Sequence, residues 1–111
     1  MAGYALTPDV LELVAERFRA LAVPARLRIL NALRDGEHTV SELVDPTGLG
    51  QANVSKHLQL LHALGFVERR KDGLYVYYSL AGDEVFRLCD IVCGRIAAEA
   101  TARDRLMRRA R

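Results

Sequence analysis

The chain has 111 residues, half of them hydrophobic and 27% charged, which is the composition of one globular domain over residues 1–111 and excludes a disordered tail. A formal net charge of +2 excludes a uniformly basic surface, so any attraction to a polyanion has to come from clustered cations. Because there is no signal-like N-terminus, no run of about 18 apolar residues and no cysteine-rich framework, we expect a cytoplasmic location, reduced thiols and no membrane partner.

Two helices are predicted in the first third of the chain. Thr7-Pro8-Asp9 supplies an N-cap hydroxyl, a first-turn proline and a first-turn acid, which favour a helix over about residues 8–21. Its apolar positions recur at helical spacing and are Leu11, Val14, Ala15, Phe18 and Leu21. A second helix is expected to begin at Pro24 and end at Asp35-Gly36, with an apolar face made of Leu27, Leu30 and Leu33.

The next segment has the pattern of a helix-turn-helix. Thr39-Val40-Ser41-Glu42 has the spacing of a capping box, in which the Thr39 hydroxyl and the Glu42 carboxylate each accept the other residue's backbone N–H. A tight turn is predicted after this short third helix, at Pro46, Gly48 and Gly50. A longer helix should follow and end at Gly65, with an apolar stripe made of Val54, Leu58 and Leu61.

From Phe66 the apolar period changes to two, which predicts a β-hairpin with its turn at Asp72-Gly73. One side of this ribbon would carry Leu74, Val76, Tyr78 and Leu80, and the other Tyr75, Tyr77 and Ser79. A last helix is expected over about residues 83–106, with an apolar side made of Val85, Leu88, Cys89, Val92, Cys93, Ile96 and Ala100. The arginines at the end of the chain could touch DNA, but we expect a frayed and solvated terminus; they are Arg103, Arg105, Arg108, Arg109 and Arg111.

The helix after Gly50 has a polar side opposite its apolar stripe. A helical wheel places Gln51, Ser55, Lys56 and Gln59 there. Glutamine and serine suit base edges in the major groove and lysine suits phosphate, although any solvated helix face shows a similar pattern. The cations beside the hairpin turn extend this surface and favour double-stranded DNA as the partner. The residues expected to contact DNA are Thr39, Ser41, Gln51, Asn53, Ser55, Lys56, His57, Gln59, Arg69, Arg70, Lys71 and Tyr75.

Six short segments between about Ala20 and Ile96 carry a family resemblance. They are Pro24-Ala25-Arg26-Leu27-Arg28-Ile29-Leu30, Val54-Ser55-Lys56-His57-Leu58, Leu61, Gly65-Phe66-Val67, Asp72-Gly73 and Tyr77-Tyr78. In this order and spacing they resemble the ArsR/SmtB family of winged-helix repressors. The chain departs from the family pattern at Val23 and Gly50, where a capping acid and a capping serine are frequent, and glycine at an N-cap costs only a few tenths of a kcal/mol, roughly.

The resemblance implies a mainly α fold, a winged helix-turn-helix of five helices and a two-stranded wing, with residues 51–64 as the recognition helix. It also implies a homodimer built from the first and last helices, acting as a transcriptional repressor on an imperfect palindromic operator and released by an inducer. Two alternatives stay open: a regulator without a sensor, and a winged-helix module that binds an acidic protein. We expect no enzyme, because no nucleophile and base pair or phosphate-cradling loop is visible.

The sensor question rests on two thiols. By the resemblance, Val44 and Pro46 stand where metal-sensing members have cysteines, and Arg95 and Ala98 stand where a zinc site has a histidine and a glutamate. Cys89 and Cys93, one helical turn apart, could bind a thiophilic metal or metalloid, react with an oxidant or reactive sulfur, or simply pack in the dimer interface, so the cofactor stays unknown. The three histidines lack ligand-like neighbours, and His57 is expected to pack or hydrogen-bond.

Overall fold

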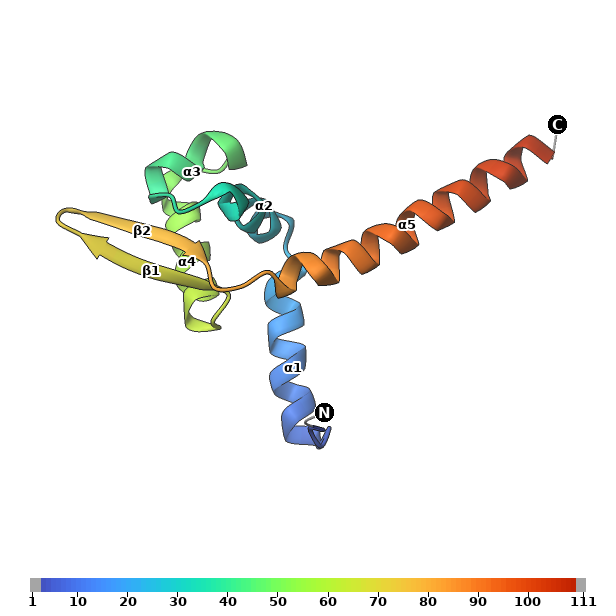
Figure 1. The fold of residues 1–111 in the computed structure, drawn as a ribbon, viewed down its shortest axis with the longest axis horizontal. Coiled ribbons are helices and arrows are strands. Elements are labelled where there is room, and N and C mark those ends of the chain that lie inside the picture. The colour runs from blue at the N-terminus through green and yellow to red at the C-terminus, as the bar shows by residue number, and fades with distance from the viewer. Residues whose placement is uncertain (1–2, 110–111) are drawn as a thin grey trace. The chain divides into compact units, whose positions relative to one another are not determined.

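The structure is a computed structural model that describes residues 3–109 (Figure 1). Two compact units make up the chain, one up to Ala81 and one from Gly82. Within the described residues the predicted five α-helices and antiparallel hairpin are confirmed. The elements in chain order are α1 (Pro8–Leu21), α2 (Pro24–Ala32), the 3₁₀ helix η1 (Leu33–Asp35), α3 (Val40–Thr47), α4 (Gln51–Ala63), β1 (Val67–Asp72), β2 (Tyr75–Leu80) and α5 (Glu84–Arg109).

The core of the first unit lies between α2, α3 and α4. Its fully buried side chains are aliphatic, and such residues can be packed densely without leaving a polar group unpaired. Val67 and Tyr78 of the hairpin are also buried and close one side of this core. The core therefore holds one face of α4 and leaves its other face free. The fully buried residues are Ile29, Leu30, Leu33, Leu43, Val54, Leu58 and Leu61.

Capping interactions fix the start of α1 and both ends of α3. The Thr7 hydroxyl accepts the Val10 N–H at 3.3 Å at the start of α1. At α3 the predicted capping box is confirmed, because the Thr39 hydroxyl accepts the Glu42 N–H at 3.3 Å and the Glu42 carboxylate accepts the Thr39 N–H at 2.9 Å. Gly48 ends α3 with φ of 70°, a left-handed conformation that glycine adopts without strain.

Two details of the sequence interpretation were wrong. Pro46 is not in the turn but in the last turn of α3, where its missing N–H removes the one helical hydrogen bond to the Glu42 carbonyl and only one residue of helix follows. Leu74 is not on the apolar side of the hairpin but in its two-residue turn, and its side chain is 99% exposed. The turn takes Leu74 because the preceding Gly73 adopts the positive φ of 61° that a tight hairpin requires at its first position.

The hairpin is joined to the segment that precedes α3. β1 and β2 pair in antiparallel register from Val67 opposite Leu80 to Asp72 opposite Tyr75. The other edge of β2 pairs with His38, since the His38 N–H donates to the Tyr78 carbonyl at 2.9 Å and the Tyr78 N–H donates back at 2.8 Å. β2 thus lies between β1 and the residue just before the α3 cap.

α1 leaves the rest of the first unit over most of its length (Figure 1). Only Ala20, near its C-terminal end, is buried. Phe18 and Leu11 of the predicted apolar stripe are 56% and 48% exposed within the single chain. Val14, Ala15 and Leu21 of the same stripe are half-buried, so the apolar face of α1 is only partly covered within the described chain.

The second unit is the single long helix α5. It begins beside an ion pair between Asp83 and Arg87 at 2.7 Å, in which the guanidinium lowers the pKa of the Asp83 carboxyl. α5 continues past the predicted end to Arg109, and its arginines are exposed, as expected for a solvated terminus, while Arg111 lies outside the described residues. None of the helices within residues 3–109 is long and apolar enough to cross a membrane.

Candidate nucleic-acid interface

The exposed face of α4 carries most of the polar residues expected to contact DNA. Val54, Leu58 and Leu61 turn into the core, and this fixes the direction of every other side chain on the helix. Gln51, Asn53, Lys56 and Gln59 are exposed, and Ser55 and His57 are half-buried at the two margins of the free face. The core and the polar face are therefore two sides of one helical pattern.

α3 and α4 meet through residues from the expected set. The Gln51 side-chain amide donates to the Ser41 hydroxyl at 3.4 Å across the turn between the two helices. Both side chains are exposed, so they remain accessible beside one another. The Thr39 hydroxyl, in contrast, already accepts a backbone N–H in the capping box and serves the start of α3.

Thr47 holds the turn between α3 and α4, a role that the sequence interpretation missed. Its buried hydroxyl donates to the Leu43 carbonyl at 2.5 Å and accepts the Leu49 N–H at 3.3 Å. The Thr47 side chain thus accepts the backbone N–H of Leu49 in the turn and, through its own O–H, donates to a carbonyl of α3. A threonine directly before a C-capping glycine was the available signal, because hydroxyls often bond to local backbone groups in turns.

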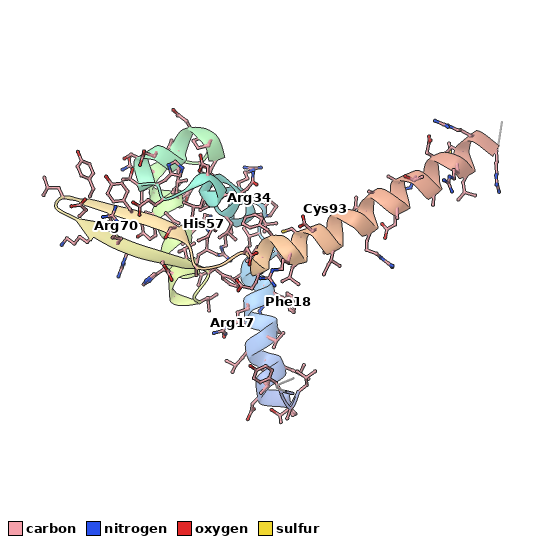
Figure 2. The ribbon with its side chains drawn as sticks, viewed as in Figure 1. Arg17, Phe18, Arg34, His57, Arg70 and Cys93 are labelled. Atoms are coloured by element: carbon pink, nitrogen blue, oxygen red, sulfur yellow. The ribbon has the colours of Figure 1, made fainter. Side chains whose placement is uncertain are left out.

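His57 lies at the margin of α4 that faces α2 (Figure 2). Its Nδ1 accepts a hydrogen bond from Nε of Arg26 at 3.1 Å, and Nη1 of Arg26 donates to the Ala20 carbonyl at 3.3 Å. Burial lowers the pKa of His57, and the positive charges of Arg26 and Lys56 add to this effect. The prediction that His57 forms a hydrogen bond is confirmed.

The hairpin divides its cations between two faces. Side chains alternate along a strand, so Arg69 and Lys71 share one face of β1 while Arg70 is on the other. Arg69 and Lys71 line a shallow hollow of about 380 Å³ together with Val76 and Tyr78. Within residues 3–109 neither cation forms an ion pair, which leaves both available to an anion. Tyr75, also expected to contact DNA, is exposed next to the turn.

Arg70 is bound within the chain. Its Nη2 lies 2.6 Å from Oε1 of Glu37 and its Nε donates to Oε2 at 3.2 Å. Its Nη1 is 3.5 Å from the Asp72 carboxylate, and the guanidinium lies 4.7 Å from the centre of the Tyr77 ring. These hydrogen bonds lower the pKa of Glu37 and raise the pKa of Arg70. Glu37 and Arg70 are 33 residues apart, and nothing in the sequence pattern predicted their contact.

His38 sits between two carboxylates at the base of α3. Its Nε2 is 2.8 Å from Oδ1 of Asp35, and this contact lowers the pKa of the Asp35 carboxyl. Its buried Nδ1 has no hydrogen-bond partner in the described chain, and the nearest carboxylate oxygen, from Glu42, is 3.9 Å away. The pKa of Glu42 is lowered mainly by the N–H of Thr39.

The two thiols are free and lie on α5. Cys89 is half-buried and Cys93 is exposed (Figure 2). Within residues 3–109 no group of three or more histidine, cysteine, aspartate or glutamate side chains is placed to hold a metal ion. A metal shell at the thiols would therefore need ligands beyond this single chain.

Comparison with known proteins identifies related chains of the same architecture. Residues 23–69, which run from the N-cap of α2 into β1, match the family described as bacterial regulatory protein, arsR family. The HTH-type transcriptional regulator Rv0081 of Mycobacterium tuberculosis is 36% identical over 95 residues, 82% of this chain and 83% of its own length. The "Probable mercury resistance operon repressor" of Streptomyces lividans is 44% identical over 78 residues, 70% of this chain and 60% of its own length.

Solved structures agree with the sequence matches. The crystal structure of Rv0081 superposes with a TM-score of 0.76 at 34% identity and covers 87% of this chain and 98% of that one. The winged helix-turn-helix DNA-binding domain of Mb0332 from Mycobacterium bovis, described as homodimeric, gives 0.69 at 37% identity over 89% of this chain and 91% of that one. Several curated relatives are longer, since this chain spans between 37% and 60% of their length.

Proposed function

Because the chain belongs to the bacterial arsR family of regulatory proteins, we propose that it is a homodimeric, sequence-specific DNA-binding transcriptional repressor. One observation carries this proposal: the free polar face of α4 stands on an aliphatic core, in the same unit as a hairpin whose Arg69 and Lys71 form no ion pair within residues 3–109. An enzyme or a purely structural module has no need of this combination.

The residues divide into two roles in this proposal. Gln51 and Gln59 read base edges in the major groove, because an amide presents a donor and an acceptor together. Lys56, Arg69 and Lys71 neutralise phosphates, which supplies most of the sequence-independent affinity. Ser41 and Ser55 add hydroxyl contacts at the edge of the same face, and Thr39, Asn53, His57, Arg70 and Tyr75 complete the set that we expect near the duplex.

A second copy of the chain is the partner that we propose for the apolar faces of α1 and α5. Leu11 and Phe18 of the α1 stripe are exposed in one chain, as are Val92 and Ile96 of the α5 stripe. Burial of such residues contributes roughly 1.5–3 kcal/mol each, enough to favour association. The homodimeric Mb0332 domain supports this arrangement. A two-fold pair would present its two α4 helices to successive major grooves, so the operator would be an imperfect palindrome.

The inducer that we propose is a thiophilic metal or metalloid, or an oxidant or reactive sulfur species, that acts on Cys89 and Cys93. The two thiols are free, lie one turn apart and leave Cys93 exposed to a reagent. They are part of the helix that we assign to the dimer interface, so a change there would reach both copies. The name of the Streptomyces lividans relative, a mercury resistance operon repressor, supports a soft ion among the candidates.

A selection of bound fragments from genomic DNA tests the DNA-binding proposal. We expect enrichment of an imperfect palindrome with half-sites about one helical turn apart, and competition by random DNA only at much higher concentration. A folded dimer that retains no fragment at low salt would reject the proposal and favour the protein-binding module.

The thiol proposal needs a separate measurement on the selected operator. Release of the wild-type protein by a thiophilic metal or an oxidant is compared with release of the Cys89→Ser/Cys93→Ser variant. We expect the variant to stay bound at reagent concentrations that release the wild type. Equal responses of the two proteins would leave the cysteines as packing residues.

A further inference from the structure

The side chain of Arg70 crosses the hairpin instead of pointing away from it. Arg70 belongs to β1 and is paired in register with Tyr77 of β2. Its guanidinium lies over the Tyr77 ring at 4.7 Å and reaches Glu37 on the far side of β2 with two hydrogen bonds, at 2.6 and 3.2 Å. A planar guanidinium that meets both oxygens of one carboxylate fixes direction as well as distance.

A backbone contact lies directly beside this ion pair. His38, which follows Glu37, exchanges two backbone hydrogen bonds with Tyr78, which follows Tyr77. The hairpin is therefore attached to the same short segment by one backbone bridge and one bidentate side-chain pair. Thr39, the next residue, caps α3, so this segment also determines where the helix-turn-helix begins.

We infer that Arg70 and Glu37 form a strap that sets the angle of the hairpin, so that Arg69 and Lys71 on the opposite face of β1 meet the duplex. The inference rests on the proposed DNA binding and deepens it. Arg70, one of the residues that the sequence assigned to DNA contact, becomes a positioning residue, and Glu37 becomes part of the DNA-binding machinery although it carries a negative charge.

Whether Glu37→Gln strengthens or weakens DNA binding distinguishes the strap from a direct contact between Arg70 and a phosphate. If Arg70 left Glu37 to bind a phosphate, Glu37→Gln would remove its competitor and tighten DNA binding. Loss of an acid near a polyanion also strengthens binding in general, whatever the acid does. The strap makes the opposite prediction, because Glu37→Gln breaks the bidentate pair and lets the hairpin change its angle.

The experiment measures the affinity of the full chain for its selected operator between about 50 and 200 mM salt. The variants are Glu37→Gln, Arg70→Gln, the double variant and Glu68→Gln as a control. Glu68 is on the same strand and the same face as Arg70, is exposed, and forms no ion pair or hydrogen bond through its side chain within residues 3–109. It therefore reports the loss of one negative charge without loss of the strap.

We expect Glu37→Gln to weaken binding at least about threefold, and the double variant to be no weaker than Arg70→Gln, because both substitutions break one interaction. Glu37→Gln should also make the affinity depend less steeply on salt concentration, although it removes no cation. The reason is that Arg69 and Lys71 would no longer contact phosphates of the duplex. Glu68→Gln should bind as tightly as the wild type or more tightly. Thermal unfolding of each variant checks that it is folded, which we expect because Glu37 and Arg70 are both exposed.

Tighter binding by Glu37→Gln, together with a salt slope that falls by about one unit only when Arg70 is replaced, would overturn the strap and make Arg70 a phosphate ligand. Additive losses in the double variant would overturn it as well. The proposed function fails in a different way, because then neither the wild type nor Glu68→Gln would select any operator.

Discussion

Nε of Arg26 in α2 donates to Nδ1 of His57 in α4 at 3.1 Å, so the helix that carries the polar face is tied to its neighbour across 31 residues. The same guanidinium donates to the Ala20 carbonyl of α1 at 3.3 Å. A histidine nitrogen accepts only when it carries no proton, so this contact requires neutral His57 with its hydrogen on Nε2. The contact is therefore sensitive to pH.

Because of this contact, we expect the free energy of unfolding of the domain to decrease when the pH is lowered. The folded state lowers the pKa of His57 below its ordinary value of 6.5, mainly by burial, so the unfolded chain takes up the proton first. The contribution is fully present above about pH 6.5 and is lost as pH falls through the lower pKa of the folded protein. Urea unfolding of the wild type and of His57→Gln between pH 8 and pH 5 measures it.

All other titrating groups are the same in the wild type and in His57→Gln, so their effects cancel when the two free energies of unfolding are subtracted. The free energy of unfolding should drop more steeply on acidification for the wild type than for His57→Gln. Parallel curves for the two proteins would mean that Arg26 and His57 do not share this hydrogen bond in solution.

Lys56→Ala and Gln59→Ala should weaken DNA binding in different ways. Lys56 is an exposed cation, and its loss should reduce affinity for every sequence and lower the salt slope by about one unit. Gln59→Ala should leave the slope unchanged and lose about 1–3 kcal/mol of discrimination at one base pair. Titrations of the operator, of single-site operator variants and of random DNA measure both. Equal loss on all sequences for Gln59→Ala would exclude base reading by this residue.

Thr47→Val tests the turn of the helix-turn-helix. Valine has nearly the same shape but leaves the Leu49 N–H without the hydroxyl that accepts it, so we expect a loss of about 1–3 kcal/mol in the free energy of unfolding. Thr101→Val is the matched control, because the Thr101 hydroxyl also donates to a helix carbonyl, at 3.0 Å, but is exposed. A similar, small effect of both substitutions in urea unfolding would contradict the role of Thr47.

Phe18→Glu should convert the protein from a dimer to a monomer without unfolding it. Phe18 is more than half exposed in one chain, so its replacement removes little from the core. Two charged residues near a two-fold axis would repel and lose the burial that we assign to the dimer. Sedimentation equilibrium measures the mass, with the exposed Glu12→Gln on the same helix as the control. A wild type that sediments as one chain, or a variant that remains paired, would reject α1 as part of the interface.

Local patterns in the sequence were sufficient for the helix-turn-helix. The capping box at Thr39 and Glu42 and the stripe of Val54, Leu58 and Leu61 depend on residues within one or two turns, so periodicity and capping rules predicted them. Pro46 and Leu74 were misplaced because a proline in the last turn of a helix and a leucine in a hairpin turn are both permitted when the neighbouring backbone allows them.

The long-range contacts of the site had no such signal. The pairs Arg26 with His57 and Arg70 with Glu37 join segments that are 31 and 33 residues apart. Each contact depends on how whole helices and strands pack against one another. An arginine in the sequence, taken alone, predicts only that a cation is present. The sequence thus located the cations of the hairpin but could not separate Arg70 from Arg69 and Lys71.

The two-residue turn at Gly73 decides which charges each side of the hairpin displays. A slip of one residue between the strands would turn every side chain of β1 over, exchanging Arg69 and Lys71 for Glu68, Arg70 and Asp72. That face would then carry two negative charges and one positive charge in place of two positive charges, with no change in the composition of the protein. Evolution of this loop could therefore retune the electrostatic character of the hairpin without replacing a single ionisable residue.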